Sequence, residues 1–279
     1  MLPAHPDSLA STPWLEEHLS DPSLRIVDAR FPQSDAAFQS GHIPGAVKVD
    51  PLTDLADPAE RPLLLVPSVG QFEALMSRLG IGNRTTVVVY DTEGGLWCAR
   101  LWWAFRYYGH QEVKLLEGGW RKWQLERRPI ETQVTHPTAS AFRAQAHPEL
   151  RATLAEVQAA VGRTNVILLD ALSANQHLGK LADMPSLPAG HIPSAKNVPA
   201  PSNLDATNGM LRWPLEKLAA LYAEAGVTPD KRIITYCGGG YYGAFNLFVL
   251  YQLGYDDVRL YDGSWLEWVS RGGKIETGP

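Results

Sequence analysis

The chain has 279 residues, with 30 acidic and 25 basic side chains and a formal net charge of −5. This acidic balance, without a run of lysines or arginines, argues against nucleic acid as a partner. We find no 18-residue apolar segment and no basic and apolar leader at the N-terminus, so we expect a cytoplasmic protein with no membrane partner. At roughly 150 residues per domain, the length predicts two domains.

Four sequence features occur twice, in the same order and at nearly constant separation. Each half has an apolar strand ending in Asp-Ala, a His-Ile-Pro turn, a β-branched strand, and a Gly-Gly-Trp or Gly-Ser-Trp segment. The first set spans 24–30, 41–47, 86–91 and 115–123, and the second spans 166–171, 190–198, 233–237 and 260–268. Repetition over this length indicates duplication of a whole domain rather than a short solenoid repeat.

Within each half, short apolar strands alternate with helical patterns. This alternation is typical of parallel βα units, so we expect an α/β protein with two tandem domains, each a parallel sheet flanked by helices. Residues 132–150 contain two prolines and few periodic apolar positions, which indicates a linker. The predicted domains are therefore 9–131 and 151–279.

Cys237 is the candidate nucleophile. It follows a strand expected at 232–236 and precedes a helix expected at 244–253. A thiol at the carboxyl end of a strand, facing the positive end of a helix, is favoured as a thiolate. The glycines that follow allow backbone N–H groups to converge on an anionic sulfur. The predicted cradle consists of Gly238, Gly239, Gly240, Tyr241, Tyr242 and Gly243.

The first half provides an internal comparison for this loop. It has Asp91 where the second half has Cys237, so it lacks the nucleophile, and the carboxylate is expected to repel anions. We interpret the first domain as a catalytically inactive partner that forms one wall of the cleft. The other cysteine, Cys98, aligns with Gly243 and is interpreted as a packing residue, with a sulfur relay as the alternative. The spacing of the two cysteines indicates no disulfide framework and no metal site.

These motifs together resemble the tandem-domain rhodanese family of sulfurtransferases. The resemblance rests on Asp-Ala after a strand, His-Ile-Pro-Gly-Ala, a cysteine loop after Ile-Thr-Tyr, and Tyr-Asp-Gly-Ser-Trp-Leu-Glu-Trp. It implies an inactive first domain, a catalytic second domain and a persulfide on Cys237. It further implies a small donor of the thiosulfate or 3-mercaptopyruvate type, and cyanide or a thiol such as thioredoxin or glutathione as acceptor. Such chemistry requires no metal and no organic cofactor.

The chain departs from the family pattern where donor anions are bound. Leu172 and Leu178 occupy the positions that align with the arginines expected to bind the donor, and neither usual loop sequence is intact after Cys237. The candidate substrate-binding residues are therefore Arg30, His42 and Asp170. We expect Arg30 or His42 to supply charge across the cleft, whereas Asp170 is interpreted as mainly structural and bordering the cleft.

Two other functions compete with sulfur transfer from a small donor. A dual-specificity phosphatase also uses a cysteine loop, but it needs an arginine six residues after the cysteine, and residue 243 is glycine. The second alternative is a non-catalytic sulfur carrier, in which a partner enzyme loads Cys237. The replaced arginines keep this alternative open.

Overall fold

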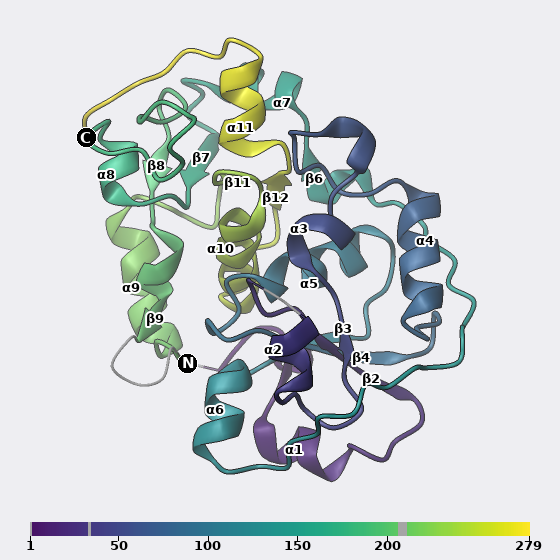
Figure 1. The fold of residues 1–279 in the computed structure, drawn as a ribbon. Coiled ribbons are helices and arrows are strands. Elements are labelled where there is room, and N and C mark those ends of the chain that lie inside the picture. The colour runs from purple at the N-terminus through teal and green to yellow at the C-terminus, as the bar shows by residue number, and fades with distance from the viewer. Residues whose placement is uncertain (1, 33–34, 206–210) are drawn as a thin grey trace.

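The computed structural model describes residues 2–32, 35–205 and 211–279, and it contains two five-stranded sheets of the same topology (Figure 1). The strand order is β1-β5-β4-β2-β3 in the first sheet and β6-β12-β11-β7-β8 in the second. All pairings within the two sheets are parallel. The predicted fold class, two tandem α/β domains, is confirmed.

The first sheet consists of short strands with apolar residues on both faces. Its strands are β1 (Leu9–Ala10), β2 (Leu24–Asp28), β3 (Val47–Lys48), β4 (Thr86–Tyr90) and β5 (Val113–Leu116). In β4, Val87 and Val89 belong to one apolar cluster, while Val88 and Tyr90 belong to another. Because successive side chains of a strand point to opposite faces, this run shows that the sheet is covered on both sides.

The second sheet repeats this arrangement and adds a small antiparallel pair, β9 with β10. The strands of this half are β6 (Arg151–Ala152), β7 (Val166–Asp170), β8 (Lys196–Asn197), β9 (Leu204–Asp205), β10 (Leu211–Arg212), β11 (Arg232–Tyr236) and β12 (Val258–Tyr261). β11 lies between β7 and β12. Its carboxyl end is therefore in the middle of the sheet edge, where ligands of parallel sheets bind.

The helices of both halves connect the strands and cover the sheets. Those of the first half are α1 (Thr12–Glu17), α2 (Asp35–Gln39), α3 (Pro51–Asp54), α4 (Val69–Arg78), α5 (Cys98–Tyr107) and α6 (Gly119–Leu125). Those of the second half are α7 (Leu154–Ala160), α8 (Ala174–His177), α9 (Leu215–Glu224), α10 (Tyr241–Gln252) and α11 (Ser264–Ser270). None of the helices within the described ranges has both the length and the apolar character to span a membrane.

The two domains meet through α5 and α10, which pack against each other at the centre of the molecule (Figure 1). The ring centroids of Trp102 and Phe248 are 4.9 Å apart, and an Arg106 guanidinium nitrogen donates to the Tyr251 hydroxyl at 2.9 Å. Side chains of both helices belong to one apolar cluster that extends into both sheets. The domains therefore share a core, and their relative position is fixed by buried apolar contact.

The predicted linker, 132–150, runs along the surface of the first domain. The backbone N–H of His147 donates to the carbonyl of Tyr107 at 2.8 Å. Phe142 is 3% exposed and lies edge-on to Phe72, with ring centroids 5.6 Å apart. The segment is thus docked onto the first domain rather than suspended between the two.

Candidate active site

Cys237 follows β11 directly, and its side chain is 3% exposed. The chain turns at Gly240, whose φ of 88° is in the left-handed region, and α10 begins at Tyr241. The helix starts earlier than the predicted residue 244, because glycine permits this sharp turn and the first helical residues are held by tertiary packing. Tyr241, Tyr242 and Gly243 therefore form the first turn of α10 rather than part of the loop.

The loop holds its sulfur by a backbone amide. The N–H of Gly240 points to Cys237 Sγ with an N to S distance of 3.1 Å. The carbonyl of Cys237 accepts from the N–H of Trp265 at 2.8 Å, and the Cys237 N–H donates to Ser264 Oγ at 3.2 Å. Contacts with the start of α11 thus hold the loop in a conformation in which the Gly240 amide faces the sulfur.

The matching loop of the first domain holds a carboxylate in the same way. Oδ1 of Asp91 accepts from the N–H groups of Glu93 and Gly95, both at 2.9 Å. Oδ2 accepts from the N–H groups of Trp97 at 2.8 Å and Cys98 at 3.0 Å. The Asp91 carboxylate therefore already occupies these amide donors, and the repulsion of other anions by Asp91 stays a prediction.

Side chains from both domains lie directly against the glycines of the catalytic loop. A Cβ built on Gly238 would lie 2.6 Å from Met184 Sδ and 3.9 Å from Leu172 Cδ2. A Cβ on Gly239 would lie 2.7 Å from Cδ1 of Leu64, a residue of the first domain. The glycines are therefore required by close packing, and the walls above the sulfur are apolar.

Arg100, on α5 of the first domain, lies behind the loop. Its guanidinium is fully buried, forms an ion pair with Asp262 and donates to the carbonyl of Leu64 at 2.9 Å. A Cβ on Gly240 would lie 2.7 Å from Nη1 of Arg100. Asp262 also accepts from the N–H of Val66 at 2.9 Å. A buried charge pair between the domains therefore supports the turn that aims the Gly240 amide at the sulfur.

The two tyrosines after the loop differ in their surroundings. The Tyr241 hydroxyl donates to the carbonyl of Pro51 at 2.6 Å, and burial raises the pKa of Tyr241 above its ordinary value. Tyr242 is half-buried, and burial together with nearby acidic groups, Glu93 first, raises the pKa of Tyr242 to about 12. Both hydroxyls are therefore protonated at neutral pH.

Asp170 ends β7 and pairs in register with Tyr236, the residue before Cys237. Its carboxylate accepts from the N–H of Leu172 at 2.9 Å and lies 2.8 Å from Nδ1 of His177. Burial raises the pKa of Asp170, although the His177 contact opposes that effect. These contacts indicate a structural carboxylate that holds the β7 turn next to the catalytic loop.

Arg30 and His42 have their polar contacts inside the first domain. Arg30 Nη2 lies 2.6 Å from Oδ2 of Asp28, and its guanidinium stacks over the ring of Trp120 at 4.7 Å. His42 is fully buried, with Nδ1 2.8 Å from the carbonyl of Phe38. Among the described residues, the hydrogen bonds and ion pairs of both side chains join first-domain groups, except that His42 Nε2 lies 3.1 Å from the carbonyl of Gln133 in the linker. Their expected role across the cleft thus has no contact in its favour and stays a prediction.

Cys98 lies at the start of α5 and is 1% exposed. It belongs to the shared apolar cluster, which agrees with the interpretation of Cys98 as a packing residue. Neither Cys98 nor Cys237 is part of a disulfide. A redox or relay function for Cys98 therefore has no disulfide in this structure to support it.

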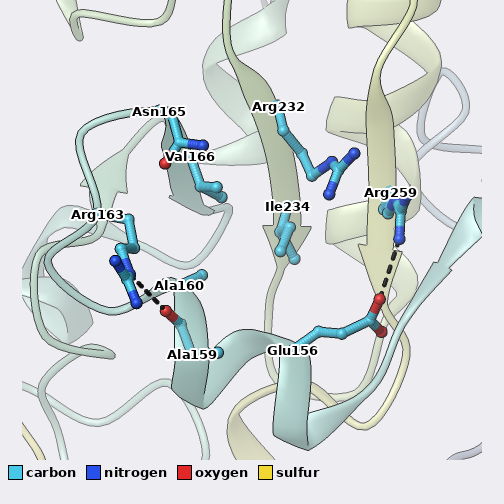
Figure 2. Close-up of a pocket in the computed structure, with 9 residues that line it drawn as sticks. All are labelled: Glu156, Ala159, Ala160, Arg163, Asn165, Val166, Arg232, Ile234 and Arg259. Atoms are coloured by element: carbon cyan, nitrogen blue, oxygen red, sulfur yellow. Dashed lines mark hydrogen bonds and ion pairs between the residues drawn. The ribbon is translucent and has the colours of Figure 1, made fainter.

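A separate pocket lies at the opposite end of the second sheet (Figure 2). It has a volume of about 350 Å³ and is lined by the first residues of β7 and β11 and by three arginines, Arg163, Arg232 and Arg259. Nη1 of Arg259 lies 3.0 Å from Glu156 Oε1, as Figure 2 shows. Arg232 is paired with Asp257 at 2.9 Å. This pocket is separated from Cys237 by the length of β11, so it is not the catalytic cleft.

Four residues of the site lie outside the sequence prediction: Leu64, Arg100, His177 and Met184. The ring of His177 stacks on that of His191 at 3.7 Å, as Phe38 stacks on His42 at 3.8 Å, but the two pairs have different spacing in the sequence, so only the structure reveals the match. Leu64 and Met184 lie in irregular segments without a periodic pattern. Only the packing of distant segments brings them to the loop.

Comparison with known proteins places this arrangement in a family. A family profile described as Rhodanese-like domain matches residues 11–126 and 153–271. The chain is 39% identical over 276 residues to the sulfur carrier protein TtuD of Thermus thermophilus, which covers 95% of this chain and 94% of that protein. It is 39% identical over 284 residues to a Mycolicibacterium smegmatis protein named "Putative thiosulfate sulfurtransferase", covering 99% of each.

Among solved structures, the fold matches the crystal structure of SseA from Escherichia coli, described as a 3-mercaptopyruvate sulfotransferase. The TM-score is 0.83 at 30% identity, over 92% of this chain and 98% of that chain. The chain therefore belongs to the rhodanese family, with one rhodanese-like domain in each half. The enzyme class expected from the sequence, a sulfurtransferase of the thiosulfate or 3-mercaptopyruvate type, is confirmed by these relatives.

Proposed function

We propose that this sulfurtransferase carries sulfur as a persulfide on Cys237, between a small sulfane donor and a thiophilic acceptor. The observation that supports this most is the amide cradle of the first domain, in which Asp91 replaces the cysteine. The carbonyls of both residues accept from the N–H of a tryptophan, Trp120 in the first turn of α6 and Trp265 in the first turn of α11, at 2.8 Å in each case. Asp91 and Cys237 thus occupy equivalent places.

Individual atoms of the Asp91 loop also have counterparts in the Cys237 loop. The Gly95 N–H donates to Asp91 Oδ1 at 2.9 Å, and the Gly240 N–H points to Cys237 Sγ at 3.1 Å. On this correspondence Sγ takes the place of Oδ1, and the outer sulfur of a persulfide takes the place of Oδ2. A persulfide is then the anion that fits the second cradle.

The donors for the outer sulfur follow from the same comparison. Oδ2 of Asp91 is bound by the N–H groups of Trp97 and Cys98, which correspond to those of Tyr242 and Gly243 in α10. The terminal sulfur would accept from these two amides at the start of the helix. Gly243 also leaves no room for a larger side chain, because a Cβ there would lie 3.1 Å from the Tyr236 backbone.

The reaction has two transfers. The Cys237 thiolate attacks the outer sulfur of the donor, a new S–S bond forms, and the donor's remaining part leaves with the electron pair as sulfite or pyruvate enolate. An acceptor such as cyanide, or a thiol such as glutathione or thioredoxin, then attacks the terminal sulfur and releases the thiolate. These steps involve no metal or organic cofactor. We place the reaction in the cytoplasm, which suits a reactive thiol.

A second candidate function is that of a sulfur carrier loaded by a partner enzyme. It is favoured by the 39% identity to a protein named as a sulfur carrier. Leu172, in place of an arginine, also leaves the loop without a donor-binding cation at that position. The phosphatase alternative is disfavoured, because Gly243 packs against the Tyr236 backbone where that chemistry needs an arginine side chain.

Mass spectrometry of the purified protein tests the proposal. After incubation with thiosulfate or 3-mercaptopyruvate, we expect Cys237 to gain the mass of one sulfur and lose it on addition of cyanide. Cys237→Ser abolishes loading, whereas Cys98→Ser, the matched control, retains it. Loading by a cysteine desulfurase alone, with both small donors inactive, would establish the carrier function instead.

A further inference from the structure

The surroundings of Cys237 bear on which donor the site accepts, and this inference rests on the proposed function. Leu64 and Met184 lie against Gly239 and Gly238, and Leu172, two residues after the end of β7, borders Gly238. Leu64 and Met184 are half-buried and Leu172 is 5% exposed, so these side chains form an apolar cover between solvent and loop. With Cys237 only 3% exposed, a small donor fits this access better than a folded protein surface does.

Aromatic rings from both domains continue the cover. The ring centroid of Trp97 lies 5.9 Å from that of Tyr242 and 4.2 Å from that of Phe31. All three side chains are partly exposed. A ring system at the edge of a buried thiol offers apolar and π surface to a ligand that carries its own apolar group.

Two carboxylates, Glu93 and Asp183, lie near this edge. Glu93 accepts from the indole N–H of Trp97 at 3.1 Å, and Asp183 accepts from the N–H of Ser173 at 2.8 Å. Both carboxylates help to raise the pKa of Tyr242. A donor with two negative charges would be repelled here.

The cation that lies against the loop does not offset these acids. Arg100 is fully buried behind Gly240 and paired with Asp262. In the first domain, by contrast, Arg30 stands where the second has Leu172, and it donates to Asp28. The second domain has exchanged a cation for an apolar side chain at the place where a dianion would need the charge.

We propose that the preferred donor is a small organic sulfane compound of the form R–SO2–S⁻ or R–S–S⁻, with an apolar R group and a single negative charge. With a thiosulfonate, the Cys237 thiolate attacks the outer sulfur, the S–S bond of the donor breaks, and the sulfinate R–SO2⁻ leaves with the electron pair. The thiolate and the thiosulfonate carry two negative charges in total, and so do the persulfide and the sulfinate that are formed. Thiosulfate reacts at the same atoms but brings one charge more and no apolar group.

Three donors with the same reacting atoms test this preference: thiosulfate, methanethiosulfonate and benzenethiosulfonate. The rate of Cys237 loading, followed by mass, is divided by the rate of each donor with free cysteine, which removes intrinsic reactivity. We expect this normalised rate of loading to be higher for methanethiosulfonate than for thiosulfate. For benzenethiosulfonate we expect it to be higher again, on the order of tenfold above methanethiosulfonate. Trp97→Ala lowers the advantage of the phenyl over the methyl donor.

The effect of charge on donor preference is tested by placing a cation beside the Cys237 loop. Leu172→Arg is expected to raise kcat/KM for thiosulfate on the order of tenfold, through KM, with little gain for benzenethiosulfonate. Because Leu172 is buried, Met184→Lys serves as a second variant with the same expectation. Leu125→Arg, on an exposed residue of α6, is the matched control and leaves the donor ranking unchanged.

The outcomes separate this inference from the proposed function. If Cys237 is loaded by all three donors but thiosulfate is equal or best, the donor preference is wrong and the persulfide function stands. Loss of thiosulfate activity in Arg61→Gln or Arg271→Gln would also overturn the preference, because these residues line a pocket between the domains. If none of the three donors loads Cys237, the proposed function itself fails.

Discussion

Arg100 of the first domain forms a buried ion pair with Asp262 of the second domain. Its guanidinium is paired with Asp262, and the same carboxylate lies 3.3 Å from Nε of Arg151. Removing one member of a buried pair leaves the other charge desolvated. The residue therefore couples the stability of the domain interface to the shape of the catalytic loop, because Gly240 packs directly on it.

Arg100→Met is expected to lower the free energy of unfolding by about 3–5 kcal/mol, because Asp262 loses its buried partner. Denaturant unfolding measures this loss. Adding Asp262→Asn to the Arg100→Met variant removes the carboxylate that has lost its buried partner and, among the described residues, retains only Arg151 as an ion-pair partner, and it is expected to recover part of the stability. If the double variant loses the sum of the two single losses, the two side chains are not coupled.

Gly240 is restricted twice, by its left-handed φ of 88° and by the Arg100 guanidinium beside it. Gly240→Ala is expected to cost more than the roughly 1 kcal/mol of backbone strain alone, and to slow the loading of Cys237 as the amide moves. Gly162→Ala is the matched control, since Gly162 has a φ of 73° with open space around it. Equal losses in both variants would show that packing at Gly240 contributes nothing.

At the scale of elements, the linker segment packs against α5 and the loop that follows α5. His110 is 2% exposed, and its ring centroid lies 5.2 Å from that of Phe105 and 5.7 Å from that of Phe142. Burial lowers the pKa of His110 below its ordinary 6.5. The folded protein therefore binds fewer protons at this group than the unfolded chain does when the pH falls below that value.

This difference gives the stability a pH dependence of known sign. The contribution of neutral His110 is complete above the unfolded pKa, and it is lost as the pH falls from about 6.5 towards the folded pKa, with a slope of at most about 1.4 kcal/mol per pH unit. His110→Phe keeps a ring without a titrating group. Unfolding measured at pH 7.5 and pH 5.5 is expected to show a smaller difference in the variant, and an unchanged difference would exclude His110 as the source.

The sequence predicted the elements better than it predicted their contacts. Apolar runs such as 86–90 and 232–236 identify strands because both faces are buried, and the repeated motifs identify the duplication. The position of Cys237 follows from the same reasoning. The start of α10 was misplaced, because the turn at Gly240 and the packing of Tyr241 depend on the other domain.

The walls of the site could not be predicted for a related reason. Leu64 and Met184 reach the loop from segments far away in the sequence, and nothing in the spacing of either residue indicates contact with Gly239 or Gly238. The sequence predicts only part of the role of Asp91. Its charge is evident from the sequence, but its four amide partners depend on the fold of the loop.

At the scale of the molecule, one core joins the two domains. Trp102 is fully buried between α5 and α10, near Phe248 and Tyr251. Trp102→Ala is expected to cost about 3–5 kcal/mol. We expect circular dichroism and the reactivity of Cys237 with a thiol reagent to report one transition in the wild type and two in the variant. Coincident transitions in Trp102→Ala would mean that the interface survives without this ring.

The carboxylate of Asp91 is, in effect, a permanent ligand of the first domain. In the second domain the Gly240 N–H points to Cys237 Sγ, and on the proposed function the anion held there would arrive with the donor and leave with the acceptor at each turnover. The outer sulfur stays covalently attached in the folded and the unfolded chain alike, but only the folded loop can donate amide hydrogen bonds to it, so loading would stabilise the folded state. The loaded form is expected to melt at a higher temperature than the unloaded form, and the difference disappears in Cys237→Ser. The folded enzyme would thus be most stable in its persulfide form, before an acceptor removes the sulfur.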